Sequence, residues 1–195
     1  MILLVRHGQT AANAAGLLLG RSDPPLTDLG RRQAVASAKV LGGVTRVVTS
    51  PLRRARETAD AFGAAVPVEV DERWTELDYG DFEGRPFNEV PSTTWQRWRS
   101  DATFTPPGGE SLAVLGRRVR DACEHLAGDA RSGGGDVAVI SHVSPIKAAV
   151  AWALAVEDTV AWRMFLDQAS ITRVAIGDHG PSLRSYNETH HLLSL

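Results

Sequence analysis

The sequence predicts an α/β fold, a three-layer α/β/α sandwich with helices on both faces of a mostly parallel central sheet. Short apolar runs alternate along the chain with segments whose apolar residues recur every three or four positions, as expected of strands alternating with amphipathic helices. The runs at residues 2–5 and 137–140 are apolar at every position, which indicates strands buried on both faces of a parallel sheet. Because 195 residues suit one domain, we expect a single domain over residues 1–195.

The first strand, at residues 2–5, ends at an arginine, a histidine and a glycine. Residues 10–22 are small, polar and punctuated by glycine, so we expect a loop there over the end of the strand. Thr27 suits the N-cap of a helix that continues to Leu41 and stops at two glycines.

A second strand is predicted at residues 46–49. The pair Ser50-Pro51 follows it, and serine at a cap with proline at the first helical position is typical of a helix start, here of a helix over residues 52–62. Residues 66–70 predict a third strand, and its Pro67 favours the edge of the sheet because proline has no N–H to pair.

Residues 71–107 lose the regular periodicity, and we expect them to form a small insertion over the edge of the sheet that carries the candidate site. Aromatic side chains crowd this segment and predict either a satellite core or a wall for a ligand: Trp74, Tyr79, Phe82, Phe87, Trp95, Trp98 and Phe104. We expect core packing for most of them.

Apolar residues at spacings of three and four predict an amphipathic helix over residues 112–126. The remaining elements are expected to be a strand at 137–140, helices at 145–155 and 157–164, and closing strands at 171–176 and 183–186.

The composition excludes several classes of function. A formal charge of −2 gives no general attraction to nucleic acid or to anionic membranes, so we expect neither as a partner. Cys123 is the only cysteine, which excludes an internal disulfide and a multi-cysteine zinc site. The first apolar run is too short for a signal peptide and no later run is long enough to span a bilayer, so we expect a cytoplasmic protein.

Two of the predicted strands end in a histidine, at His7 and His142. If both strands are central and parallel, both histidines lie at the edge of the sheet where α/β proteins bind ligands. Arginines at positions 53, 54 and 56 stand in the first turn of the helix that follows the second strand, and this helix start points at the same edge. Arginine forks and a helix N-terminus favour a doubly charged anion, so these residues predict a phosphate site.

Several motifs, in order along the chain, resemble the histidine phosphatase superfamily, the group that includes cofactor-dependent phosphoglycerate mutase. They are residues 4–10 (LVRHGQT), 26–30 (LTDLG), 50–55 (SPLRRA), 76–84 (ELDYGDFEG), 107–111 (PGGES) and 139–142 (VISH). The last but one is more similar to phosphatases of the family than to its mutases.

This resemblance implies hydrolysis of a phosphate monoester through a phosphohistidine, with no metal and no other cofactor. In the matching motifs His7 takes the position of the nucleophile, and Arg6 and Arg54 take those of the phosphate-binding arginines. Glu76 falls at the position of the acid/base carboxylate. His142 matches the second histidine of the family, which we expect to be protonated.

Three further residues are expected around the substrate. Asn13 resembles a family position near phosphate or substrate, and Arg21 and Val143 are expected to contribute to the pocket wall. Val143 stands where the family usually has glycine, so we expect its N–H to help hold phosphate while its side chain narrows the pocket. Asp78 and Asp81 are the rival carboxylates to Glu76.

Three other functions remain open from the residues. Two histidines with nearby acids also suit metal-assisted hydrolysis, although Arg6 beside His7 disfavours a bound cation. A phosphate-binding sensor without catalysis is the second alternative, and phosphotransfer of the phosphoglycerate mutase type is the third. Residues 84–105 hold three arginines, no lysine and many aromatics, which favours a phosphatase acting on a small phosphorylated metabolite. The natural substrate and a homodimer through an edge strand or the insertion are left open.

Overall fold

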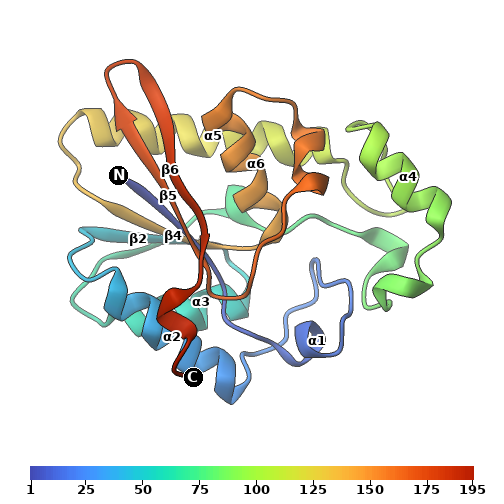
Figure 1. Cartoon of the computed structure of the whole chain (residues 1–195), viewed down its shortest axis with the longest axis horizontal. Helices are drawn as coiled ribbons and strands as arrows, with labels where there is room; N and C mark the ends of the chain where they lie inside the picture. The colour runs from blue at the N-terminus through green and yellow to red at the C-terminus, as the bar shows by residue number, and fades with distance from the viewer.

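The computed structural model describes residues 1–195 and contains one six-stranded sheet between two layers of helices (Figure 1). The strands are β1 (Ile2–Arg6), β2 (Arg46–Thr49), β3 (Val68–Val70), β4 (Val137–Ser141), β5 (Ile171–Gly177) and β6 (Gly180–Glu188). The α-helices are α1 (Ala11–Ala14), α2 (Asp28–Val40), α3 (Arg53–Ala59), α4 (Ser92–Ser100), α5 (Leu112–Arg131) and α6 (Val143–Leu154). Short 3₁₀ helices complete the chain: η1 (Asp60–Phe62), η2 (Glu72–Trp74), η3 (Gly80–Phe82), η4 (Phe87–Glu89), η5 (Asp158–Arg163) and η6 (His190–Leu192).

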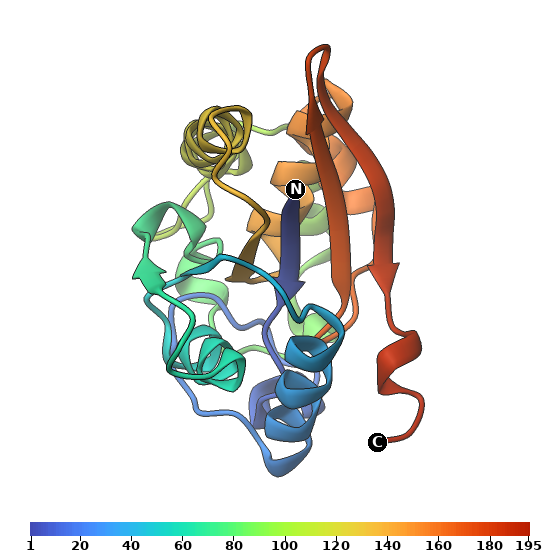
Figure 2. The ribbon, with the colours of Figure 1, turned by 90° about the vertical axis from the view of Figure 1, so that its left-hand side faces the viewer.

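The strand order is β3-β2-β4-β1-β5-β6, and the first four strands of this order are parallel to one another. β5 pairs antiparallel with β1, and β6 pairs antiparallel with β5, so a long hairpin closes one side of the sheet. Figure 2 shows β3 and this hairpin at opposite margins, with the hairpin turn projecting beyond the other strands. The predicted α/β class with a mostly parallel sheet is confirmed, and β3 occupies an edge as its preceding proline indicated.

Alternate residues of the central strands pack into two separate cores. Ile2 and Leu4 of β1 belong to the larger core, which α5 and α6 cover. Leu3 and Val5 point the other way, into a smaller core beneath α2 and α3. The alternation of side chains along a strand therefore explains why β1 is apolar at every position and buried throughout.

The register of the two central strands decides where the site lies. Arg6, the last residue of β1, stands opposite Ser141, the last residue of β4. The backbone N–H of His7 continues the ladder by donating to the Ser141 carbonyl at 2.9 Å. His7 and His142 therefore leave the sheet side by side, with ring centroids 5.0 Å apart.

Two helix starts differ from the prediction. α3 begins at Arg53 with Leu52 at the N-cap and no side-chain cap; the Ser50 hydroxyl accepts from the Leu52 N–H at 3.3 Å and is also bonded to His142. α6 begins at Val143, two residues before Pro145, since a proline is tolerated in the first helical turn, where N–H groups have no intrahelical partner. The segment expected as a helix at 157–164 is the 3₁₀ helix η5. None of the helices is both long enough and apolar enough to cross a membrane.

Residues 71–107 contain α4 and three of the 3₁₀ helices, and they lie at the end of the sheet where β1 and β4 stop (Figure 1). Trp98 of α4 is buried and makes edge or stacked contacts with Tyr79, Phe82 and Trp162. Most aromatics of this segment thus pack in a core, as expected; Phe87 lines a cavity, and Tyr79 and Trp95 contact both the core and that cavity.

Candidate active site

A cavity of about 270 Å³ lies at the ends of β1 and β4, roofed by the insertion and by the segment after η5. Its lining includes Arg6, His7, Asn13, Glu76 and Val143, together with apolar and aromatic side chains from four parts of the chain: Leu17, Leu18, Leu19, Tyr79, Phe87, Trp95, Trp162, Phe165 and Leu166. A wider depression between α2 and the C-terminal residues holds none of the predicted site residues.

Arg6 is held by one end of its guanidinium and is unsatisfied at the other. Its Nη1 donates to the Leu166 carbonyl at 2.6 Å. Its Nε is buried and has no hydrogen-bond partner in the protein. Burial lowers the pKa of Arg6 to about 10, which still leaves it a cation at neutral pH. An unsatisfied N–H on a cation at a cavity wall is suited to an anionic oxygen, because burying such a donor unpaired costs free energy.

His7 has its two ring nitrogens in different environments. Nδ1 lies 2.7 Å from the Gly8 carbonyl, which can only accept, so Nδ1 carries the proton and Nε2 is left with a lone pair. Nε2 receives a hydrogen bond from Arg54 Nε at 3.2 Å. Burial, and then the positive charges of Arg54 and Arg6, hold the pKa of His7 well below its ordinary value. The imidazole is therefore neutral, with a basic nitrogen beside two cations.

Arg54 joins the two histidines. Its Nη1 and Nη2 donate to the carbonyls of Ser22 and Gly20 at 2.6 and 2.8 Å, so the loop over the strand end fixes the plane of the guanidinium. Its Nε lies 3.2 Å from His7 Nε2 and 3.2 Å from His142 Nδ1. Its side chain is fully buried. Of the arginines at the start of α3, Arg53 instead pairs with Glu57 at the exposed surface.

His142 accepts from Arg54 at Nδ1, and its Nε2 lies 2.7 Å from the Ser50 hydroxyl. Burial, followed by the charge of Arg54 and the proximity of His7 and Arg6, lowers the pKa of His142 well below its ordinary value. This shift favours the neutral ring, whereas we expected a protonated His142. Burial is the largest cause of this shift, and it depends on packing between segments far apart in the chain, which the local sequence does not show.

Glu76 is almost completely buried and lies at the N-terminus of α6. Its carboxylate accepts hydrogen bonds from the backbone N–H groups of Val143 and Ser144, at 3.0 and 3.1 Å, and from its neighbour Leu77 at 2.7 Å. The Val143 N–H that we expected to hold phosphate is therefore bonded to Glu76. Glu76 lines the cavity, and the rival Asp78 does not.

The two remaining predicted residues differ in position. Asn13 lines the cavity, where its Oδ1 accepts from the Thr10 N–H and hydroxyl at 3.1 and 2.9 Å, which leaves its amide N–H₂ free for a ligand. Arg21 is exposed and lies outside the cavity lining, with its Nη2 3.4 Å from a Glu110 carboxylate oxygen. The loop bends so that the Gly20 carbonyl faces Arg54 and the next side chain turns outward.

The sequence interpretation missed Lys147 and four residues of the segment 162–168 that also line the cavity: Trp162, Phe165, Leu166 and Gln168. Lys147 is four residues after Val143 and so shares its face of α6. That spacing could have identified Lys147, but a helix start at Pro145 leaves Val143 outside the helix. The segment 162–168 begins at the end of the 3₁₀ helix η5, and no local sequence pattern predicts that it lies beside the cavity.

Metal ligands do not gather in this site or elsewhere. The chain contains no group of three or more His, Cys, Asp or Glu side chains arranged to hold a metal ion. Around His7 and His142 the nearest charged groups are arginines, which disfavour a second cation.

Known proteins resemble this chain over nearly its whole length. The model of the histidine phosphatase superfamily (branch 1) matches residues 2–189. A bifunctional protein of Mycobacterium tuberculosis, Rv2228c, is 38% identical over 200 residues, which cover 98% of this chain and 54% of that protein. The chain thus spans about half the length of the first curated relatives it matches.

Two solved structures share nearly the whole fold. A mycobacterial glucosyl-3-phosphoglycerate phosphatase in complex with VO3 superposes with a TM-score of 0.85 at 31% identity, over 96% of this chain and 98% of that one. A phosphoserine phosphatase variant from Entamoeba histolytica, in complex with phosphoserine, gives a TM-score of 0.89 at 28% identity, over 98% of each chain. From its motifs, its fold and the family match over residues 2–189, we conclude that this chain belongs to the histidine phosphatase superfamily, branch 1.

Proposed function

We propose that this protein hydrolyses the phosphate monoester of a small metabolite through a phosphohistidine at His7, without a metal ion. The observation that carries the proposal is the state of His7, whose unprotonated Nε2 stands at the cavity between Arg6 and Arg54. A neutral imidazole is nucleophilic, and neighbouring guanidinium groups can stabilise the charge of a transferring phosphoryl group. The names of the two structural neighbours, both phosphatases of small phosphate esters, support the same class of reaction.

In the first step His7 Nε2 attacks phosphorus, the N–P bond forms and the ester P–O bond breaks. The Nδ1 proton stays on the ring, held by the Gly8 carbonyl. Arg6 Nε donates to one equatorial oxygen, over which the transition state spreads its negative charge. Arg54 Nε–H, which His7 Nε2 accepts before the reaction, is released as that nitrogen bonds to phosphorus and can then donate to another oxygen. Glu76, in its acid form, gives its proton to the leaving alkoxide.

In the second step water attacks phosphorus and breaks the N–P bond, which returns His7 to its neutral form. The water loses a proton to the carboxylate of Glu76, so the acid of the first step becomes the base of the second. A bound phosphate dianion offsets the charges of Arg6 and Arg54 and thereby favours a protonated His142, which can then donate to phosphate. Asn13 offers its free amide N–H₂ from the opposite loop.

His7→Ala tests the nucleophile. We expect it to lower hydrolysis of p-nitrophenyl phosphate by about 10³-fold or more, because no neighbouring group can replace Nε2. The matched control is His179→Ala, whose exposed side chain lies at the β5–β6 turn and whose loss leaves turnover intact. Brief mixing with a ³²P-labelled monoester and an alkaline quench traps the phosphoenzyme, since phosphohistidine survives alkali. Label in the N-terminal peptide supports the proposal; label on a serine contradicts it.

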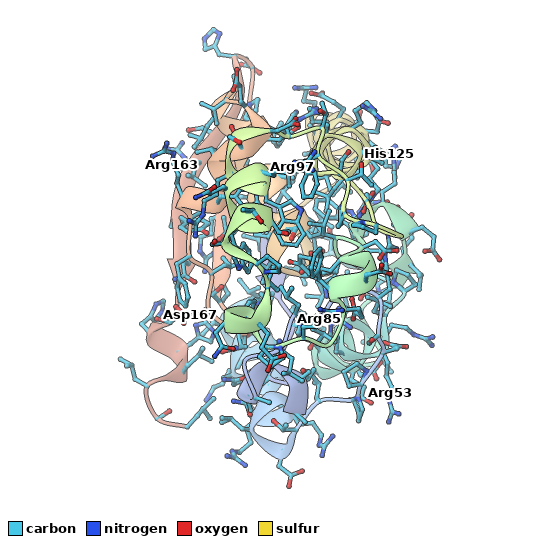
Figure 3. All side chains as sticks on the ribbon, turned by 90° about the vertical axis from the view of Figure 1, so that its right-hand side faces the viewer. Arg53, Arg85, Arg97, His125, Arg163 and Asp167 are labelled. Carbon is cyan, nitrogen blue, oxygen red and sulfur yellow. The ribbon has the colours of Figure 1, made fainter.

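A mutase shares the phosphohistidine but must shield it from water and hold a substrate acid with further cations. The arginines of the insertion do not serve this purpose, because Arg85, Arg97 and Arg99 are exposed and lie outside the cavity lining. Arg85 and Arg97 stack on Phe82 and Phe104, and Figure 3 shows both labelled residues on the outer side of the molecule that carries α4.

Product analysis separates the two reactions. With 3-phosphoglycerate and catalytic 2,3-bisphosphoglycerate, a phosphatase releases inorganic phosphate as its main product. Formation of 2-phosphoglycerate much faster than phosphate release would assign the protein as a mutase.

A further inference from the structure

Lys147 is a second cation of the cavity that the proposed reaction does not use. It lines the same cavity as His7 and Arg6, from one turn further along α6 than Val143. The chain has two lysines in all, and the other, Lys39, lies exposed near the end of α2. Lys147 is thus the one lysine of the chain that lies at the cavity and not on the exposed surface.

The ammonium group of Lys147 has no partner within the protein. Its Nζ takes part in no hydrogen bond or ion pair, although the side chain is largely buried. Nζ is not fully enclosed by the protein, and Lys147 lines both this cavity and a smaller pocket beside Tyr79 and Trp162. A partly buried ammonium without a partner in the protein is available to an anion that enters the cavity.

No group of the protein around Lys147 pairs with its ammonium, so the anion that pairs with it must be a ligand. Of the titratable groups that share the cavity, Glu76 is occupied by the N–H groups of α6, and Tyr79 is buried. Arg6 and His7 on the β1 side belong to the proposed phosphate site. From η5 and the segment after it the cavity receives Trp162, Phe165, Leu166 and Gln168, none of which is charged.

We propose that Lys147 binds a carboxylate of the substrate, so that the enzyme selects phosphate monoesters of small carboxylic acids. The inference rests on the proposed function, because it takes the phosphate to lie at His7 and Arg6. One ammonium offers a single positive charge, which matches a carboxylate; a second phosphate would bring two negative charges to one donor in an otherwise apolar wall. The small volume of the cavity, about 270 Å³, limits the distance between the two anionic groups.

The desolvation of Lys147 gives this recognition a pH dependence. Burial lowers its pKa to about 8, against a smaller opposing effect of Glu76. Above about pH 8 the amine is neutral and attracts a carboxylate weakly. Two phosphate monoesters that differ only in a carboxylate have similar phosphate pKa values. The ratio of their rates therefore reports the charge of Lys147 and not the ionisation of the phosphate.

The test compares 3-phosphoglycerate with glycerol 3-phosphate, which differ only in a carboxylate and a hydroxymethyl group. In the wild-type enzyme we expect the ratio of kcat/KM for the first over the second to fall as the pH rises from 7 to 9. Lys147→Met keeps the length of the apolar stem and should lower this ratio at pH 7 by about 10- to 100-fold, the effect of losing a hydrogen bond to a charged group. Lys147→Arg should recover part of it, and the control Lys39→Met should leave it unchanged.

Binding to the His7→Ala background separates this inference from the proposed function, because it needs no turnover. In this background, calorimetry should show that adding Lys147→Met weakens the binding of 3-phosphoglycerate by about 10-fold or more relative to the binding of glycerol 3-phosphate. Equal loss for both ligands, or an unchanged ratio, would overturn the carboxylate assignment. A larger loss for 2,3-bisphosphoglycerate than for 3-phosphoglycerate would overturn it in favour of a second phosphate. Should Lys147→Met fail to fold, the pH dependence of the wild-type ratio decides the same question.

Discussion

The chemistry of His7 depends on which ring nitrogen carries the proton. The Gly8 carbonyl holds that proton on Nδ1, so the lone pair of Nε2 faces the cavity and Arg54. Arg54 is in turn oriented by two carbonyls of the loop over the strand end. The nitrogen that we propose as the nucleophile is thus set by backbone groups, which a substitution of neighbouring side chains does not remove.

Glu76→Gln tests the acid/base assignment at this scale. We expect kcat to fall by about 10²- to 10⁴-fold for alkyl phosphates, whose leaving group needs a proton, and by much less for p-nitrophenyl phosphate. Steady-state kinetics on the two substrates measures the difference. Because Glu76 also binds the N-terminus of α6, a uniform loss for both substrates would point to a structural role.

The matched control is Asp78→Asn, since Asp78 accepts from the Gly80 N–H and lies outside the cavity lining. It should leave the dependence on the leaving group unchanged. If Asp78→Asn showed that dependence and Glu76→Gln did not, the carboxylate would be wrongly assigned.

At the scale of elements, the loop after β1 is held against the start of α2 by two glycines. A Cβ on Gly8 would lie 2.3 Å from the Gly30 carbonyl oxygen, and a Cβ on Gly30 would lie 2.2 Å from that of Gln9. The Gly8 N–H also donates to Thr58 of α3 at 3.1 Å. Close backbone packing among β1, α2 and α3 therefore positions His7.

Gly30→Ala should lower the free energy of unfolding by about 1–3 kcal/mol, because the added methyl group meets backbone that cannot rotate away. Gly128→Ala is the matched control. Gly128 is also helical, in α5, and a Cβ there meets nothing within 4 Å. It should raise stability by about 0.5–1 kcal/mol through helix propensity alone. Urea unfolding measures both, and equal effects would contradict the packing argument.

At the scale of the whole molecule, folding buries two histidines among arginines and keeps them neutral. Burial and nearby arginines hold the pKa of both His7 and His142 below the value of about 6.5 in an unfolded chain. Below that pH the unfolded chain takes up protons that the folded protein does not. Stability is therefore fully present above about pH 6.5 and is lost as the pH falls.

We expect the free energy of unfolding to fall between pH 6.5 and 5 with a slope approaching about 1.4 kcal/mol per pH unit for each of these histidines. Urea unfolding at a series of pH values measures it. His142→Asn should reduce the slope, and part of it remains through His7 and through His191, whose pKa burial also lowers. His125→Gln is the control, because that side chain is exposed on α5. An unchanged slope in His142→Asn would mean that folded His142 is protonated.

The sequence by itself determined the class of the fold and most of the candidate site. The apolar runs at residues 2–5 and 137–140 are local patterns, and each ends at a histidine whatever the rest of the chain does. The motif around Arg54 likewise identifies the arginine from its immediate neighbours. Local periodicity and turn residues suffice for such predictions because they depend on positions close together in the chain.

Only the tertiary structure decided what these residues do to one another. Arg6 at the end of β1 pairs with Ser141 at the end of β4, which brings the ring centroids of the two histidines to 5.0 Å from each other, and burial beside Arg54 lowers the pKa of His142. The same packing turns Arg21 outward and Lys147 into the cavity. Desolvation and the field of neighbouring charges depend on distances between residues far apart in the chain, and those distances exist only once the strands have paired.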